Sequence, residues 1–450
     1  MAATRIPAEE IGDVSRQLAA RLQENRAGKA VGVYSICSAN RFVLEAGMLQ
    51  AKRDGSPLLI ESTSSQVNQF GGYTGQTPAQ FVAFVKELAG RVGLPTARVI
   101  FGGDHLGPNP WRNEDPASAM QKAAELVRDY VLAGYTKVHL DASMHLARDP
   151  VEPERPLADE IVSDRAAELC KAAEEAHEKL ENGTPPLYVI GTEVPIPGGE
   201  LSGSRAPEIT RAEDALKTIE TAKRAFESRG LLAAWHRVIA LVVQPGVEFG
   251  DATIFPYRPE ESRELSRLAE THWHGVFEAH STDYQTSAAL REMVRDHFAL
   301  LKVGPWLTFA FREAVFALAA IEEEWLGTRQ GVTLSRVCDS LDEGMVARPE
   351  YWKSYYHGNE DELRFARKYS LSDRSRYYWP QPAVAAAVQR LLDNLTLYPA
   401  PFSLLSQFMP NQAARVHAGE LLNNPDDLIR NKILEIIDHY ATACGMGVSQ

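Results

Sequence analysis

The sequence of 450 residues predicts an α/β protein that folds as a (β/α)8 TIM barrel with a C-terminal helical extension. From residue 31 onward, short apolar runs rich in β-branched residues alternate with longer amphipathic segments, as in βα units around a parallel sheet. Eight such runs occur over about the span that the fold requires. No G-x-G-x-x-G sequence follows a predicted strand, which disfavours an open dinucleotide-binding sheet.

Each apolar run is a predicted strand, and a predicted helix follows it. The predicted strands are 31–36, 58–61, 98–102, 137–140, 187–191, 238–243, 276–279 and 299–303. The predicted helices are 41–53, 78–92, 116–133, 157–181, 211–228, 259–271, 284–296 and 306–325. Thr77 and Asp115 each place a capping oxygen before a proline, whose missing amide proton would lack a partner in the first helical turn anyway.

The alternation of strands and helices stops after about Leu326. We therefore expect three regions, which are an N-terminal helical segment at 1–30, the barrel at 31–326 and the helical extension at 327–450. Aromatic clusters occur in the extension, for example at 351–352 and 377–379. Such side chains mostly pack one part of a protein against another, so we expect them to hold the extension on the barrel rather than bind a ligand.

The formal net charge of −13 argues against binding to nucleic acids or anionic membranes, because both need clustered lysine and arginine. The four cysteines lie far apart and form no C-x-x-C, so no disulfide framework or zinc knuckle is indicated. Residues 1–30 include several acidic side chains, unlike a signal or transit peptide, and no apolar run approaches the roughly 18 residues of a membrane span. We expect a cytoplasmic protein.

In a barrel of this type the catalytic groups lie where strands end and loops begin. The residues at these positions are polar, and they are Ser35, Asn40, Glu61, Asp104, His105, Asp141, Glu193, Gln244, His280, Ser281, Lys302 and Gly304. Turn formation is the alternative role for each serine, asparagine and glycine. It does not explain the carboxylates and histidines as a set, because ionisable groups that converge on a narrow barrel rim are partly desolvated.

A divalent metal would satisfy this convergence. His105, His280 and Glu193 would provide two imidazoles and one carboxylate, a ligand set that suits zinc or another transition metal. Asp104, Asp141 and Glu193 are the candidates for proton transfer.

The other histidines are interpreted as structural. His139, His236 and His297 lie in or before apolar runs and away from the strand ends. His272 and His274 resemble a metal-binding pair but precede the seventh strand, which places them at the opposite end of the barrel.

Two segments could bind a phosphate group. Barrels often use the loops after strands seven and eight, which here contain Ser281, Gly304 and the neighbouring Lys302. The extension offers Arg374 and Arg376, which could clamp a phosphate bidentately. A strand-flanking lysine and a solvated charged loop are the alternatives. Ser35, Asn40, Glu61 and Gln244 complete the expected substrate contacts.

Five segments resemble the GatZ/KbaZ family, and the resemblance runs over nearly the whole chain. They are 33–40 (VYSICSAN), 101–108 (FGGDHLGP), 139–144 (HLDASM), 190–195 (IGTEVP) and 373–379 (DRSRYYW). Members are described as the non-catalytic, stabilising subunit of class II D-tagatose-1,6-bisphosphate aldolase, and older labels call some of them tagatose 6-phosphate kinases. Other relatives are described as 4-epimerases that interconvert D-tagatose 6-phosphate and D-fructose 6-phosphate.

The resemblance implies a barrel related to class II aldolases. Asp104-His105 resembles the Asp-His pair after the third strand of those enzymes, where the histidine binds zinc and the aspartate handles a proton. His280 stands where they place another zinc histidine. Gln244 stands where an aldolase would supply a third histidine, which leaves Glu193 or Gln244 as the remaining ligand.

Three functions are then open. Kinase activity ranks last, because the sequence contains no G-x-x-x-x-G-K-[ST]. A non-catalytic subunit has no need of a metal and proton-transfer site, although such a site could survive from an ancestor. Cleavage of the C3–C4 bond gives an enediolate and an aldehyde that can turn and recombine, so aldolase and 4-epimerase chemistry share one site.

We therefore expect a metal-dependent 4-epimerase of tagatose and galactitol catabolism, with the aldolase subunit as the alternative. The expected partners are a phosphorylated ketose, a class II aldolase catalytic subunit, and further copies of this chain in a homo-oligomer.

Overall fold

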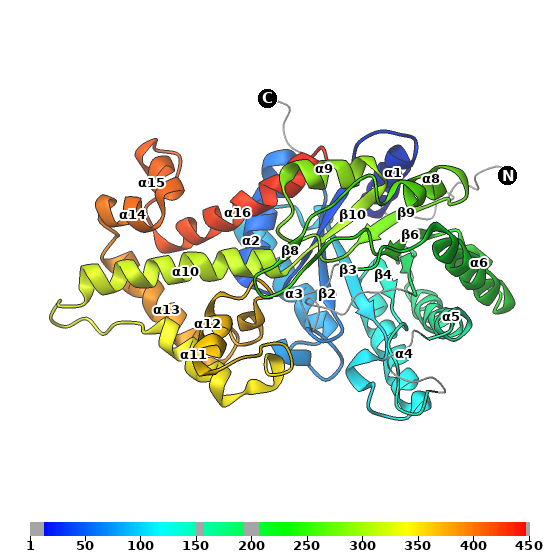
Figure 1. The fold of residues 1–450 in the computed structure, drawn as a ribbon, viewed down its shortest axis with the longest axis horizontal. Helices are drawn as coiled ribbons and strands as arrows, with labels where there is room; N and C mark the ends of the chain where they lie inside the picture. The colour runs from blue at the N-terminus through cyan, green and yellow to red at the C-terminus, as the bar shows by residue number, and fades with distance from the viewer. Residues whose placement is uncertain (1–12, 150–156, 193–206, 447–450) are drawn as a thin grey trace.

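The computed structural model describes residues 13–149, 157–192 and 207–446. Within them, eight parallel strands close into a barrel in the order β1-β10-β9-β6-β5-β4-β3-β2 (Figure 1). The strands are β1 (Val33–Cys37), β2 (Leu58–Thr63), β3 (Val99–Leu106), β4 (Lys137–Leu140), β5 (Leu187–Ile190), β6 (Val238–Val243), β9 (Val276–Ala279) and β10 (Phe298–Val303). The predicted fold class is confirmed, and β4, β6 and β9 have the predicted bounds.

A helix follows each strand. The barrel helices are α2 (Arg41–Asp54), α3 (Pro78–Val92), α4 (Pro116–Leu132), α5 (Asp159–His177), α6 (Ala212–Ser228), α8 (Arg263–Thr271), α9 (Ser287–Arg295) and α10 (Pro305–Leu326), with a short α7 (Leu232–Trp235) before β6. Thr77 and Asp115 cap α3 and α4 as predicted, since their side chains accept the backbone N–H groups of Gln80 and Ser118. An antiparallel pair, β7 (Glu248–Phe249) and β8 (Ile254–Phe255), interrupts the chain after β6, and α8 begins later than predicted.

Helix α1 (Asp13–Arg26) closes the N-terminal end of the barrel. Its Arg26 Nε donates to the carbonyl of Trp273, in the loop before β9, at 2.8 Å, and Asn25 Nδ2 donates to that of Val294, in the last turn of α9, at 2.7 Å. His274 lies at this end too, where its Nε2 is 3.0 Å from the Val238 carbonyl oxygen. The C-terminal ends of the strands are therefore the open face.

The chain beyond α10 forms a helical extension (Figure 1). Its helices are α11 (Val337–Ala347), α12 (Glu360–Tyr369), α13 (Pro382–Leu397), α14 (Phe402–Phe408), α15 (Pro410–His417) and α16 (Pro425–Ala443). The short 3-10 turns are η1 (Gly72–Thr74), η2 (Thr96–Arg98), η3 (Asn109–Trp111), η4 (Pro349–Tyr351) and η5 (Arg374–Tyr377). Helix α16 returns to pack on α2, α9 and α10. None of the helices described has the length and apolar character that a membrane span needs.

The interior of the barrel is charged as well as apolar. Glu61, Lys137, Glu278 and Lys302 come from β2, β4, β9 and β10, and all four are buried. Lys137 Nζ lies 2.6 Å from Glu61 Oε1 and 2.7 Å from Glu278 Oε2, and Lys302 pairs with Glu61. A side chain at Gly102 would put a Cβ 2.6 Å from Glu61 Cγ, so the glycine makes room for this network. We call these four residues the charge quartet.

Candidate active site

A cavity of about 440 Å³ opens at the C-terminal ends of the strands, within the size range of small-molecule sites. Its floor carries Asp104, His105, His280 and Lys302. Its opposite wall comes from the extension and carries Glu350, Tyr351, Tyr355, Arg374, Arg376 and Tyr377. The extension therefore completes the cavity that the barrel begins.

Asp104 and His105 are neighbours in sequence, yet both reach the cavity. In a regular strand their side chains would point to opposite faces. The pairing of β3 with β4 shifts register between Gly103 and Leu106, and His105 adopts a positive φ of 49°. A bulge of this kind re-aims side chains beside active sites. The loop after β3 also passes close to β4, since a Cβ at Gly107 would lie 1.6 Å from the carbonyl oxygen of Asp141.

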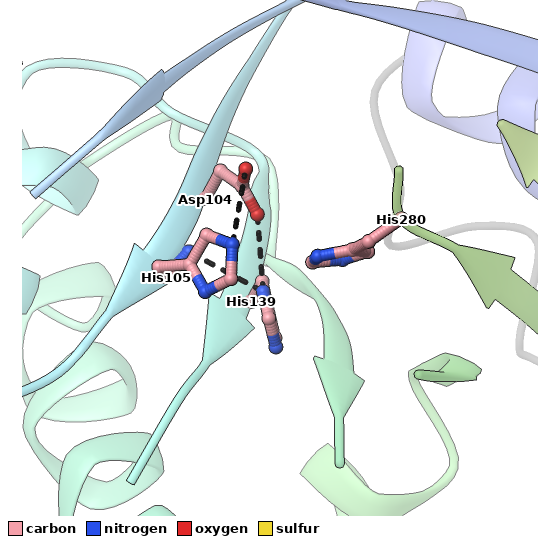
Figure 2. A group of neighbouring side chains, drawn as sticks. All are labelled: Asp104, His105, His139 and His280. Carbon is pink, nitrogen blue, oxygen red and sulfur yellow. Dashed lines mark hydrogen bonds and ion pairs between the residues drawn. The ribbon is translucent and has the colours of Figure 1, made fainter. Parts of the chain in front are cut away.

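Three histidines lie together beside Asp104 (Figure 2), and two of them, His105 and His280, line the floor of the cavity. The ring centroids of His105 and His280 are 4.9 Å apart, and His139 lies 5.1 Å from the first and 5.4 Å from the second. With Asp104 they offer four ligand atoms that lie within 4.8 Å of one another. His139, which the sequence analysis interpreted as structural, thus lies within the candidate metal-binding group. Lys137, His139 and Asp141 alternate along β4, so all three face the barrel interior.

A carboxylate orients each of these imidazoles. His105 Nδ1 lies 2.7 Å from Asp141 Oδ2, and His280 Nε2 lies 2.9 Å from Glu278 Oε1. His139 Nδ1 lies 3.1 Å from Asp104. Such partners fix the tautomer and orientation of metal-binding histidines.

The donor set fits a divalent metal. The Nε2 atom of His139 is buried and has no hydrogen-bond partner among the described residues. Three neutral imidazoles suit zinc or another transition metal, and each of them has one nitrogen that its carboxylate partner does not occupy.

The carboxylates around His105 favour a positive charge on its ring, whereas burial lowers the pKa of His280. Burial lowers the pKa of His105, but the carboxylates of Asp104 and Asp141 outweigh burial and raise it to about 9. The pKa of Asp141 is held below its usual range despite burial, by its hydrogen bond to His105 and by the charge on that ring. Burial lowers the pKa of Lys302 to about 8. A bound cation would be stabilised by the same carboxylates.

The two predicted proton-transfer aspartates, Asp104 and Asp141, differ in whether their carboxylates face the cavity. Asp141 Oδ1 accepts the backbone N–H and hydroxyl of Ser143, at 3.0 and 2.6 Å, while Oδ2 holds His105. It therefore orients the ring of His105. Asp104 lines the cavity itself. Glu193, the third candidate, lies outside the described residues.

Several predicted substrate contacts have other partners. Glu61 belongs to the charge quartet beneath the cavity, and Ser35 Oγ lies 3.6 Å from Cys37 Sγ in the same buried layer. Asn40 Oδ1 caps α2 by accepting the Phe42 N–H at 2.9 Å. Gln244 Oε1 accepts the Gly246 N–H at 2.8 Å. None of these four side chains is among the described residues that line the cavity.

The amides predicted to hold a phosphate after β10 already have a partner. Asp283 Oδ1 accepts the backbone N–H groups of Gly304 at 3.1 Å and Trp306 at 2.8 Å, at the start of α10. The Ser281 hydroxyl donates to Glu248 Oε2 at 3.2 Å. Gly304 and Ser281 still line the cavity, but an internal carboxylate takes the place that a phosphate would occupy at this helix terminus.

The extension supplies the other predicted phosphate contacts. Arg374 and Arg376 both line the cavity from η5. The prediction that the aromatic residues of the extension pack against the protein holds for Trp352, Tyr356 and Tyr378, which are buried. Tyr351 and Tyr377 likewise pack on Tyr73 of a barrel loop, and with Tyr355 they also line the cavity.

Comparisons with known proteins identify the family of this chain. Residues 18–445 match the family described as D-tagatose-1,6-bisphosphate aldolase subunit GatZ/KbaZ-like. The chain belongs to the GatZ/KbaZ-like family. The crystal structure of a probable tagatose 6-phosphate kinase from Sinorhizobium meliloti 1021 is 43% identical, with a TM-score of 0.83, and the match covers 92% of this chain and 100% of that one.

Two solved aldolases are more distant from this GatZ/KbaZ-like chain. The YdjI aldolase from Escherichia coli K12 is 12% identical over 85% of this chain and 97% of that one, with a TM-score of 0.39. The fructose-bisphosphate aldolase from Campylobacter jejuni is 13% identical over 86% and 94% of the two chains, with a TM-score of 0.41.

Sequence reasoning missed three parts of this GatZ/KbaZ-like site, namely His139, Glu278 and Lys137. A signal for them was present, because polar residues recur with period two in Lys137-Val138-His139-Leu140-Asp141 and in Glu278-Ala279-His280. Inside an otherwise apolar strand, that spacing marks the residues that face the barrel interior.

Proposed function

We propose that this member of the GatZ/KbaZ-like family is a metal-dependent enzyme that interconverts D-tagatose 6-phosphate and D-fructose 6-phosphate at C4. The reaction cleaves and re-forms the C3–C4 bond. The observation that carries the proposal is the set of three carboxylate-oriented histidines, two of which line the floor of a cavity whose opposite wall holds two arginines. Buried polar groups cost free energy unless a partner satisfies them, so a ligand at this centre explains why they converge.

His105, His139 and His280 would hold the metal, which is zinc or another transition metal. When bound, the metal would polarise the C2 carbonyl of the ketose and so ease cleavage of the neighbouring C3–C4 bond. In this proposal His139 takes the place that the sequence analysis gave to Glu193 or Gln244.

Asp104 is positioned to move the proton of the C4 hydroxyl. His139 Nδ1 at 3.1 Å and Lys302 Nζ at 3.0 Å hold its Oδ1. Its Oδ2 lies 3.8 Å from His105 Nε2, beyond hydrogen-bond distance, and would accept the proton. As O4 loses its proton, the C4–O4 bond becomes a carbonyl, and the electron pair of the C3–C4 bond passes into a C2–C3 double bond. Return of that pair to the other face of C4 gives the epimer.

Arg374 and Arg376 would bind the 6-phosphate. Their planar guanidinium groups suit the geometry of phosphate oxygens, and the amides after β10 are held by Asp283. The phosphate would then lie at the wall opposite the histidines, and the keto end of the sugar would reach the floor.

The second candidate function is a stabilising subunit of D-tagatose-1,6-bisphosphate aldolase, and the description of the family itself favours it. On this proposal the chain would act through a surface that binds the aldolase catalytic subunit. The site would need no substrate.

One assay separates the candidates. The purified chain is incubated with D-tagatose 6-phosphate, without ATP, and the formation of D-fructose 6-phosphate is followed by NMR. Activity should disappear with a chelator, return with zinc, cobalt or manganese, and be absent from His280→Gln. His417→Gln, which changes an exposed histidine on α15, should behave like the parent protein.

A chain that is inert with each metal, yet binds and stabilises a separately purified class II aldolase, would support the subunit instead. Size-exclusion chromatography of the chain with and without the aldolase reports that complex and the homo-oligomeric state.

A further inference from the structure

A tyrosine in the cavity wall is held in an unusual setting. The ring of Tyr377 stacks on Tyr351, with centroids 4.7 Å apart and planes inclined by 9°. Tyr73 meets the same ring edge-on at 4.8 Å. These neighbours come from η4 and η1, so two distant segments of the chain fix the position of Tyr377.

The turn that carries Tyr377 is anchored to the barrel. Asp373, the residue before η5, has a positive φ of 45°. Its Oδ2 accepts the hydroxyl of Thr308, on α10, at 2.5 Å, and its Oδ1 accepts that of Ser375 at 2.7 Å. A strained residue held by buried hydrogen bonds is typical of functional sites.

Two guanidinium groups surround the Tyr377 hydroxyl. Arg376 Nη2 donates to its oxygen at 3.1 Å, and Arg374 Nη1 donates at 3.5 Å. Guanidinium groups are donors only, so neither contact uses the proton of the phenol. Burial alone would raise the pKa of Tyr377, but the charges and hydrogen bonds of Arg376 and Arg374 outweigh it and lower that pKa below 10.0. The phenol is thus prepared to release its proton toward the cavity that it lines.

We propose that Tyr377 is a catalytic residue that exchanges a proton with O4 of the substrate, on the wall opposite Asp104. This inference rests on the proposed epimerisation. After the C3–C4 bond breaks, the aldehyde must turn so that its other face meets C3. Its oxygen, O4, therefore points in one direction during cleavage and in another when the bond re-forms. One carboxylate on the floor cannot serve both directions. C4 is two carbons from the phosphate-bearing C6, so a hydroxyl beside the phosphate-binding arginines lies within reach of O4.

The proton balance is complete. In one direction Asp104 takes the O4 proton as the C3–C4 bond breaks. Tyr377 then gives its phenolic proton to O4 as the C3–C4 bond re-forms on the other face. The carboxylic acid loses its proton to water and the phenolate regains one, which restores the starting state. The reverse reaction uses the same groups in the opposite order.

The test is Tyr377→Phe, which keeps the ring and its stacking but removes the hydroxyl. We expect kcat to fall at least about 100-fold in both directions, with little change in KM. Tyr369→Phe, on an exposed tyrosine of α12, should keep the parent kcat. An unchanged kcat with a raised KM would mean that Tyr377 only orients the arginines, and would overturn the inference. Absence of epimerisation in the parent protein would overturn the proposed function instead.

A second readout does not depend on activity. The charged and titratable groups that face the hydroxyl are Arg374 and Arg376 from its own turn, Tyr351 from η4 and Tyr73 from η1. Ultraviolet titration of tyrosinate should show one tyrosine that ionises below the others and is absent from Tyr377→Phe. 3-Fluorotyrosine has a more acidic phenol, so its incorporation at position 377 should shift the pH dependence of kcat toward lower pH. This variant tests the proposal even if Tyr377→Phe fails to fold. An unmoved profile would overturn it.

Discussion

The imidazole of His139 lies 3.1 Å from the carboxylate of Asp104, and its other nitrogen is buried without a partner in the part of the chain that the structure describes. This relationship makes His139→Gln the most direct test of the metal site. Zinc affinity should fall by more than the roughly 10- to 100-fold that follows loss of an outer-shell partner. Metal content after dialysis and the zinc-induced rise in melting temperature measure it. His417→Gln is the control, and equal affinity in both variants would show that His139 is not a ligand.

Asp141→Asn tests the orienting role of this carboxylate. The substitution keeps the size of the side chain but removes the charge that holds His105 Nδ1 at 2.7 Å. Metal affinity should drop by about 10- to 100-fold while the melting temperature of the metal-free protein changes little. Metal content after dialysis and the zinc-induced rise in melting temperature again measure the effect. Loss of activity at full metal occupancy would instead assign Asp141 to proton transfer.

The charge quartet predicts strong coupling between its members. Lys137→Met removes the ammonium group that pairs with the buried carboxylates of Glu61 and Glu278. We expect a loss of about 3–5 kcal/mol in the free energy of unfolding. The double variant Glu61→Gln/Lys137→Met should lose less than the sum of the two single variants. Urea unfolding of the four proteins completes the cycle, and strict additivity would contradict the coupling.

Stability should depend on pH through Asp283. Burial raises the pKa of this carboxyl from 3.8 to about 6. The folded protein therefore binds the proton more tightly than the unfolded chain, so this group's contribution to stability falls as pH rises from about 4 to 6, by about 3 kcal/mol. Asp283→Asn keeps the acceptor for Gly304 and Trp306 and does not titrate. Its unfolding free energy should match the parent near pH 4 and exceed it at pH 7, whereas parallel curves would contradict the assignment.

Arg376→Lys tests the predicted phosphate contact by keeping the charge and removing the planar fork. KM for D-tagatose 6-phosphate should rise at least about tenfold, whereas KM for unphosphorylated D-tagatose, which has no phosphate to bind, should not change. Arg329→Lys, on an arginine that packs on Tyr398 in the extension, is the control. An equal rise of KM with both substrates would show that Arg376 does not bind the phosphate.

Much of the barrel could be predicted because local patterns determine it. The strands β4, β6 and β9 have the predicted bounds, because a short apolar run between polar segments indicates a buried strand rather than a helix. The caps at Thr77 and Asp115 formed for the same local reason. Helix α8 was predicted to start too early, because residues 259–262 form turns after the inserted β7–β8 pair.

By itself, the sequence determined that Asp104, His105 and His280 stand at or beside the ends of barrel strands and share one rim. The period-two spacing of Lys137, His139 and Asp141 indicates that His139 faces the barrel interior, but only the tertiary structure showed that it meets His105 and His280 and that Tyr377 lies across from them. Contacts between residues far apart in sequence depend on how helices and turns pack, and no local pattern encodes them.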